Sequence, residues 1–330
     1  MRRLVATLAA GTTLLAGCST SEPTDELQVS ESVTAASPAT SPGTSSPAGT
    51  VVPVGATVTA LVADPKSRTL ALATDKASVL LLSLDNLGEP ARTVALPGPA
   101  TALSLGSDGA LASVGSARQV VRISLPSGSV SSVPVDGTPA GVSQAGDQTL
   151  VALQDRKSVD VVSGGRSQRQ ISGGLFSADQ VLSVGSNAVV LDRMRTALFD
   201  VNVGEGKIGA GQRAGAGAGQ AVTDRFGRVL VTDTRGGALL AFATGPVLLK
   251  QRYPVPGAPY GIAYDPKRDL AWVTLTERNE VVGYYVASGE PQEKYRFPTV
   301  VQPNSVTVDP DSGRVLVASA TGGGVQVMQP

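Results

Sequence analysis

The sequence predicts an all-β chain built from a repeated unit of about 40 residues. A short apolar segment recurs seven times, and its starting positions are separated by 42, 39, 40, 39, 41 and 44 residues. Short apolar, β-branched runs between turns are typical of strands, and the 38 Gly and 22 Pro of the 330 residues supply many turns. Seven such units, each with room for four short strands, predict a seven-bladed β-propeller over residues 50–330.

The predicted strands follow in the same order in every unit. First strands are expected at 61–64, 103–106, 142–145, 182–185, 221–224, 262–265 and 306–309. Second strands are expected at 70–74, 111–114, 150–153, 188–191, 229–232, 270–275 and 315–319, and third strands follow, for example at 79–82, 120–123 and 281–284. The chain ends with the third strand of unit seven, at 325–328. We expect residues 51–54 to supply the missing fourth strand, because such pairing closes the ring without a free sheet edge.

Composition excludes several classes of function. The 27 basic residues equal the 27 acidic ones, so a strongly basic nucleic-acid-binding protein is excluded. Histidine is absent, which removes imidazole-based nucleophilic triads, His-ligated zinc and His general bases. A single cysteine excludes an internal disulfide framework and Cys-x-x-Cys sites.

The first 17 residues have the features of an export signal. Arg2 and Arg3 form a positive start, and residues 4–16 form an apolar stretch that is too short to span a bilayer. Residues 15–18, Leu-Ala-Gly-Cys, resemble the bacterial lipobox. That resemblance implies removal of residues 1–17, lipidation of Cys18, and attachment to the extracytoplasmic face of the cell membrane. A plain secretory signal followed by an incidental thiol is the alternative.

Residues 18–49 are expected to be the lipidated cysteine followed by a disordered tether. Seventeen of the 31 residues in 19–49 are Ser, Thr or Pro, four are acidic, and none is basic. Such a composition buries too little apolar surface to offset its chain entropy. As a flexible coil, the tether would have an end-to-end distance of roughly 30 Å.

Two stretches carry a resemblance to a known family. Residues 259–266, PYGIAYDP, and residues 303–317, PNSVTVDPDSGRVLV, resemble YVTN/NHL-type propeller repeats. Units one, six and seven match best, whereas units two to five are degenerate. With the lipobox and the tether, the whole chain resembles the exported propeller lipoproteins of actinobacteria, of the mycobacterial LppL kind. This resemblance implies a fold and a cellular location, but it specifies no ligand and no catalytic chemistry.

The turns between second and third strands carry the candidate ligand-binding residues. Propellers place these turns on one face, around the mouth of the central channel, and six of the seven units present a cation there: Lys76, Arg118, Arg156, Arg193, Arg235 and Arg278. One interpretation is a mouth that binds a phosphate or carboxylate through Arg side chains. The other is that acids cap the turns and pair with the cations as solvated surface ion pairs.

No catalytic, metal or cofactor residues are predicted. The acidic residues of 64–65, 265–266 and 309–313 lack the dense spacing of a calcium loop and fit strand-to-strand turns. Residues 209–214 match a loose nucleotide-binding pattern without the required strand–helix context, and residues 215–219 fit a flexible loop. A non-catalytic, monomeric binding module for an envelope protein, a glycan or a small anion is therefore favoured. A lactonase-like or other hydrolase activity at the channel mouth is the alternative.

Replacing Cys18 with Ala tests the predicted lipidation and membrane attachment. Without its thiol the chain has no atom to acylate, so it should leave the membrane fraction or accumulate as an uncleaved precursor. Fractionation and the electrophoretic mobility of the two forms measure this. A Cys18→Ala variant that fractionates and migrates like the unaltered protein would exclude lipidation.

Overall fold

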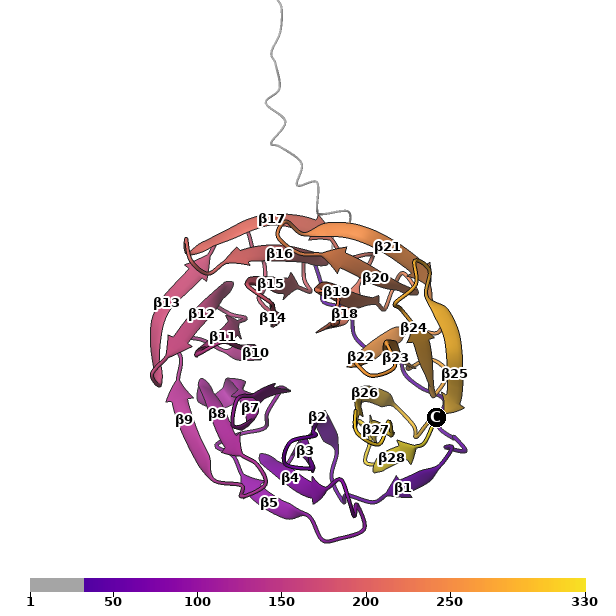
Figure 1. The fold of residues 1–330 in the computed structure, drawn as a ribbon. Coiled ribbons are helices and arrows are strands. Elements are labelled where there is room, and N and C mark those ends of the chain that lie inside the picture. The colour runs from indigo at the N-terminus through magenta and orange to yellow at the C-terminus, as the bar shows by residue number, and fades with distance from the viewer. Residues whose placement is uncertain (1–32) are drawn as a thin grey trace, which may run out of the picture.

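Seven four-stranded antiparallel sheets surround a central axis in the computed structural model, which describes residues 33–330 (Figure 1). The predicted seven-bladed β-propeller is confirmed. We number the blades one to seven along the chain. One short 3₁₀ helix, Gly115–Ala117, interrupts the strands of this part of the chain. Within residues 33–330, no helical segment has the length and apolarity that crossing a membrane requires.

The strands occupy four concentric positions in the ring. The innermost are β2 (Val58–Asp64), β6 (Ala102–Gly106), β10 (Pro139–Ala145), β14 (Gln180–Val184), β18 (Ala218–Thr223), β22 (Pro259–Asp265) and β26 (Pro303–Val308). Next are β3 (Thr69–Thr74), β7 (Gly109–Val114), β11 (Gln148–Leu153), β15 (Asn187–Asp192), β19 (Arg228–Asp233), β23 (Leu270–Leu275) and β27 (Val315–Ser319). The third position holds β4 (Ser78–Ser83), β8 (Gln119–Ser124), β12 (Ser158–Ser163), β16 (Ala197–Asn202), β20 (Ala238–Ala243), β24 (Glu280–Tyr285) and β28 (Val325–Met328). The outermost are β5 (Arg92–Ala95), β9 (Val130–Pro134), β13 (Arg166–Ser172), β17 (Lys207–Arg213), β21 (Leu248–Pro254), β25 (Gln292–Pro298) and β1 (Thr50–Val52).

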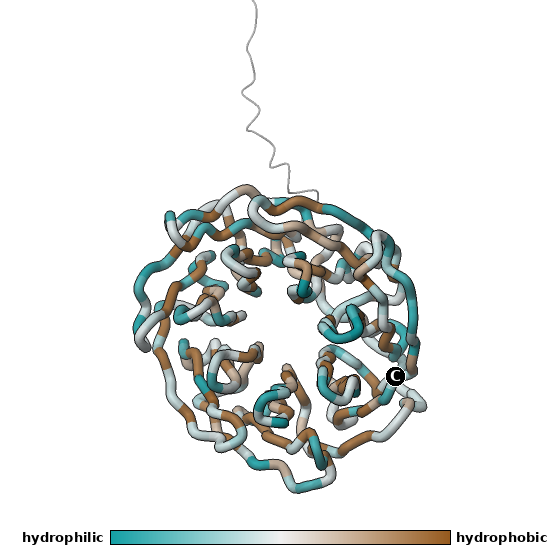
Figure 2. Tube along the Cα trace, viewed as in Figure 1, coloured by the Kyte–Doolittle hydropathy of each residue, from teal (hydrophilic) through white to brown (hydrophobic). Residues whose placement is uncertain are grey.

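The hydrophobic core lies between the blades. Second strands such as β3 and β23 are buried along their whole length, while the outer strand β13 is mostly exposed. Figure 2 shows the same division, with hydrophobic residues running through the blades and polar residues at turns and on outer strands such as β13 and β25. One buried Val, Leu and Ala cluster joins blades one and two, and another joins blades three and four. Burial of apolar surface between neighbouring sheets therefore holds each blade to the next.

Bulky aromatic side chains fill the core of blade six. Trp272 is fully buried and stacks on Tyr295 and Phe297, at centroid distances of 5.6 and 6.3 Å. Gly283 lies under this ring, and a Cβ atom there would come within 2.9 Å of the indole. The glycine of this strand therefore allows the close approach of the largest side chain in the core.

The glycines of 209–219 differ from the sequence expectation in part. Gly209 and Gly211 lie in the outer strand β17. At Gly211 a Cβ atom would stand 2.4 Å from the Phe199 ring, so this glycine makes room for an aromatic side chain. Residues 214–217 form the connection to β18, which confirms the expected loop for residues 215–217, whereas residues 218 and 219 belong to β18 itself.

The N-terminal strand completes the last blade, as predicted. Strand β1 pairs antiparallel with β28, with Thr50 opposite Val327, Val51 opposite Gln326, and Val52 opposite Val325. Figure 1 shows the indigo strand β1 beside the yellow strand β28. This single sheet thus joins the two ends of the ring.

The predicted tether is ordered over part of its length. Residues 34–48 lie against the ring as an extended segment without helix or strand, and Ala36 is 1% exposed. This corrects the expectation of a disordered tether over 19–49 for residues 33–49. Side chains of the ring hydrogen-bond the main chain of the segment, and composition alone does not reveal such partners. Residues 1–32, with the signal, Cys18 and the first part of the tether, lie outside the described residues.

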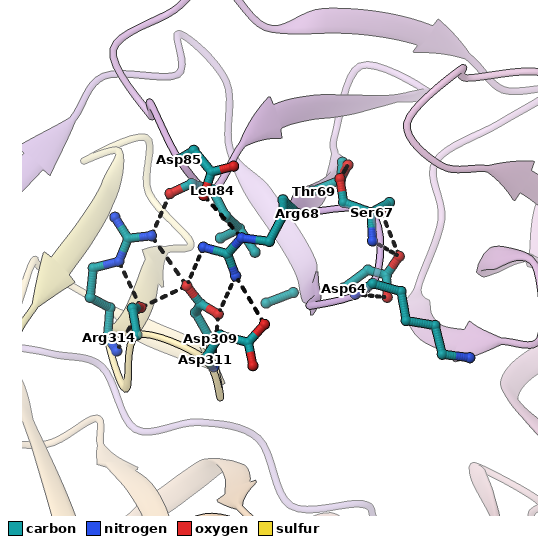
Figure 3. A network of polar contacts seen from close by, with 12 residues as sticks. Asp64, Ser67, Arg68, Thr69, Leu84, Asp85, Asp309, Asp311 and Arg314 are labelled. Atoms are coloured by element: carbon teal, nitrogen blue, oxygen red, sulfur yellow. Dashed lines mark hydrogen bonds and ion pairs between the residues drawn. The ribbon is translucent and has the colours of Figure 1, made fainter.

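A network of polar side chains joins blades seven and one, at the seam where the ring closes, on the face that carries the turns between first and second strands (Figure 3). The fully buried carboxylate of Asp309 accepts two hydrogen bonds from Arg68, at 2.7 and 3.0 Å, and others from Ser312 and Arg314, at 2.6 and 3.2 Å. Burial opposes ionisation of Asp309, but these donors outweigh it and hold the pKa of this carboxyl well below its usual range. The Asp-Pro turn of this blade therefore has a structural role, as the sequence predicted.

Two truncations test the closing strand. Removing residues 1–48 and removing residues 1–54 both delete the extended segment, but only the second deletes β1. We expect the longer truncation to lower the free energy of unfolding by about 3 kcal/mol or more relative to the shorter one, because a strand and its pairing are lost. Urea denaturation measures the difference, and equal stabilities would exclude closure by β1.

Asp309 should make the seam sensitive to acid. A carboxyl whose pKa is lower in the folded state stabilises the fold above its unfolded pKa of about 3.9 and loses this contribution as the pH falls. Asp309→Asn should cost about 3 kcal/mol at pH 7, because Arg68 and Arg314 lose their charged partner. The difference in melting temperature between the variant and the unaltered protein should begin to shrink as the pH falls below about 4, and it should disappear only as the pH falls through the much lower pKa that Asp309 has in the folded state. Parallel pH profiles would contradict this role.

Candidate functional site

The innermost strands enclose a central channel of about 620 Å³ to which all seven blades contribute. Its wall consists mainly of aliphatic residues and of neutral Ser, Thr, Asn and Gln side chains. Of the residues that line it in the described chain, four ionise: Asp179, Arg193, Tyr260 and Tyr264. Residues 33–330 contain no cluster of three or more His, Cys, Asp or Glu side chains that could hold a metal ion.

The two ends of the channel differ in chemistry. Tyr264 lies at the end of β22, and near that face the wall also includes three prolines, Pro65, Pro266 and Pro310. The Tyr264 hydroxyl donates to Asp269 Oδ1 at 2.6 Å, and burial together with this bond raises the pKa of the phenol. That tyrosine stays protonated at neutral pH. The charged groups of the wall lie at the opposite end.

Arg193 occupies that opposite end, in the turn between β15 and β16. Its guanidinium donates to the carbonyl of Ala218 and to the hydroxyl of Tyr260, both at 3.4 Å, and its Cζ lies 5.8 Å from the Tyr260 ring centroid. Its main-chain amide donates to Asp179 Oδ2 at 2.8 Å, and Asp179 Oδ1 accepts from Gln154 at the same distance. The turn is thus fixed by its backbone, while the guanidinium and the phenol face the channel mouth. This pair can bind one carboxylate or phosphate group.

The other five predicted cations lie on the same face but do not line the channel: Lys76, Arg118, Arg156, Arg235 and Arg278. Arg156 pairs with Asp136 at 2.7 Å, and Arg118 pairs with Asp155 at 3.6 Å. Lys76 Nζ donates to the carbonyl of residue 55 at 2.7 Å. Arg278 is exposed and has no side-chain partner within residues 33–330. The structure therefore does not bring the six cations together.

Arg235 and Arg193 both contact the N-terminal segment. Arg235 donates to the carbonyls of Thr34 and Ala35, at 3.0 and 3.1 Å. Arg193 donates to the carbonyl of Ala36. Two of the six predicted mouth residues thus bind three consecutive residues of the chain's own N-terminal segment.

The acids of these turns cap neighbouring loops. Asp233 accepts from the amides of Ala216 and Gly217, at 3.0 and 2.9 Å. Asp155 accepts from the Thr138 amide at 2.6 Å, and this bond is the main cause of the lowered pKa of Asp155. These hydrogen bonds agree with the interpretation that the acids cap the turns. Among the cations, Arg193 is the one whose position allows contact with a ligand in the channel.

Sequence reasoning missed the polar residues that hold the N-terminal segment. Asn279, Gln302 and Gln326 bind its main chain, and Tyr260 accompanies Arg193. One signal was present: all four acids of the predicted tether precede residue 32, and residues 33–48 carry no charge. The absence of charge and the regular prolines favour a segment that binds a protein surface over a solvated linker.

Comparison with known proteins identifies the fold but no family. No protein-family model and no curated protein matches the chain. Among solved structures, the chain is similar to Kuenenia stuttgartiensis hydrazine synthase, with 16% identity, 86% of this chain and 98% of that chain covered, and a TM-score of 0.71. It is also similar to virginiamycin B lyase from Staphylococcus aureus in a catalytically inactive histidine-to-alanine form with quinupristin, with 13% identity, 85% and 98% covered, and a TM-score of 0.70. The propeller domain of Myceliophteria thermophila Cps50 gives 12% identity, 85% and 99% covered, and a TM-score of 0.72. At these identities the likeness establishes a seven-bladed propeller and nothing finer.

Proposed function

We propose that this protein is a non-catalytic binding module, anchored to the extracytoplasmic face of the cell membrane through lipidated Cys18. Its ligand site is the channel mouth at Arg193 and Tyr260, and its ligand presents a carboxylate or a phosphate. A single observation carries the choice of site: Arg193 alone among the six predicted mouth cations lines the channel, with a phenol beside its guanidinium. The lipobox-like residues 15–18 support the anchor.

The chemistry of the channel favours binding over catalysis. Among residues 33–330, Asp179 is the single carboxylate that lines the channel, and both of its oxygens accept hydrogen bonds from neighbouring groups, so this part of the chain offers no pair of carboxylates there for acid–base work. The lyase neighbour is recorded as inactive when a histidine is replaced by alanine, and this chain has no histidine. We therefore favour binding over the hydrolase alternative.

Charge reversal tests the anion site. The unaltered soluble chain should bind inorganic phosphate or citrate weakly and saturably in calorimetric titrations, with an affinity that falls as salt is added, because exposed charges are screened. The triple variant Arg156→Glu, Arg193→Glu, Arg235→Glu should abolish this binding.

A matched control reverses three exposed cations of the outer strands: Arg166→Glu, Lys207→Glu and Lys250→Glu. This variant changes the net charge equally and should bind the anions as the unaltered chain does. Both variants should keep the circular dichroism of the parent. Loss of binding in the outer-strand control, or unchanged binding in the mouth variant, would contradict the proposed site.

A further inference from the structure

The segment 34–48 lies along one continuous surface on the face that carries the channel mouth, and we call this surface the seat. In Figure 1 its indigo trace passes blades five and six before it reaches β1 in blade seven. Arg193 and Arg235 hold residues 34–36, Thr276 and Asn279 of blade six hold residues 39–42, and Gln302 and Gln326 of blade seven hold residues 39, 41 and 48. The seat therefore spans the neighbouring turns of four blades.

Side chains of the ring form hydrogen bonds with the main chain of this segment. Gln302 donates through Nε2 to the carbonyl of Ala39 at 2.9 Å and accepts through Oε1 from the amide of Ser41 at 3.2 Å. The Ala39 amide donates to Thr276 Oγ1 at 3.0 Å, and Asn279 Nδ2 donates to the carbonyl of Pro42 at 2.9 Å. One amide that bonds residues i and i+2 of an extended strand mimics a neighbouring β-strand, which is a common way to bind peptides.

The segment also has the composition that such a seat accepts. Residues 33–48 are uncharged, and all of them except Val33 are Ala, Ser, Thr, Pro or Gly. Ala36 is 1% exposed, so a charged side chain at this position would be taken out of water. Prolines at 38, 42 and 47 favour an extended backbone and reduce the entropy lost on binding.

We propose that the turns of blades four to seven form a binding groove for extended, uncharged peptides rich in Ala, Ser, Thr and Pro, with residues 34–48 as its resident ligand in cis. Covalent linkage to β1 gives this resident ligand a high effective concentration. A free peptide of the same sequence therefore enters the groove only when the resident segment is cut or displaced.

A cleavable chain tests the groove with the whole mature protein, residues 18–330. A protease site inserted between Gly43 and Thr44 lies in an exposed stretch, and a Cβ atom at Gly43 would meet nothing within 4 Å. Cys18 is the only cysteine, so a dye on its unmodified thiol labels the released fragment 18–43 alone. After cleavage the fragment should stay bound, with slow tumbling in fluorescence anisotropy and a dissociation constant in the micromolar range.

Two variants on the ligand side separate recognition from folding of the ring. Ala36→Glu places a charged, larger side chain at the buried position, whereas Ser37→Glu places the same side chain at the exposed neighbour. The first should weaken fragment binding by about tenfold or more, and the second should change it little. On the ring side, Gln302→Met preserves the size of the side chain but removes both of its bonds to the segment, and it should weaken binding to a similar degree.

Competition completes the test. An excess of unlabelled peptide 33–43 should release the fragment, whereas the same peptide with Ala36→Glu should not, because it places a charge at the buried position. Immediate loss of the fragment on cleavage would overturn the proposal. Equal effects of Ala36→Glu and Ser37→Glu, or equal competition by the unaltered and the Ala36→Glu peptides, would overturn it as well, because either result shows that the buried position does not contribute to binding.

Discussion

Closure of the ring by β1 and β28 is the constraint on which the rest of the structure depends. Each blade packs on its two neighbours, so an unclosed chain would leave one exposed sheet edge and one uncovered blade face. Three paired residues of β1 complete the last sheet, and the Asp309 network holds the same seam on the opposite face. The channel exists because this seam is shut, since all seven blades contribute to its wall.

Within a ring of similar blades, the mouth is asymmetric. The turn acids are used in the same way, as acceptors for the amides of loops that enter the innermost strands. The cations, in contrast, have different partners in different blades. In blade four the guanidinium of Arg193 turns to the channel and Tyr260, whereas in blade three that of Arg156 turns to Asp136. A repeated scaffold thus provides one distinct site without any change to the repeat.

The closing strand and the proposed peptide groove are physically continuous. Residue 48 precedes β1 by two positions, and its carbonyl accepts from Gln326 of β28 at 2.7 Å. Gln326 is fully buried, and its Oε1 also accepts from the amide of Val300 at 3.0 Å. The end of the segment is therefore built into the last sheet, and its start rests on the mouth arginines. Occupation of the groove consequently covers part of the face that carries Arg193 and Arg235.

The architecture of this protein could be predicted from local patterns in its sequence. The 39–44 residue period, the short apolar runs and the fourth strand missing from unit seven are local patterns, and each blade repeats them. From these patterns the seven blades and the N-terminal closing strand follow, even where the repeat is degenerate.

Which candidate residues meet, and whether the N-terminal segment is ordered, depends on contacts between distant parts of the chain that local patterns do not describe. The partners of residues 36 and 48 lie 157 and 278 positions away along the chain. Composition describes how much apolar surface a segment can bury, but it does not describe the donors and acceptors that distant turns present to its main chain. Residues 33–49 have too little apolar surface to be held by burial alone, and hydrogen bonds from distant turns to their main chain hold them instead. For the six cations, the course of each turn in the folded ring decides which side chain reaches the channel.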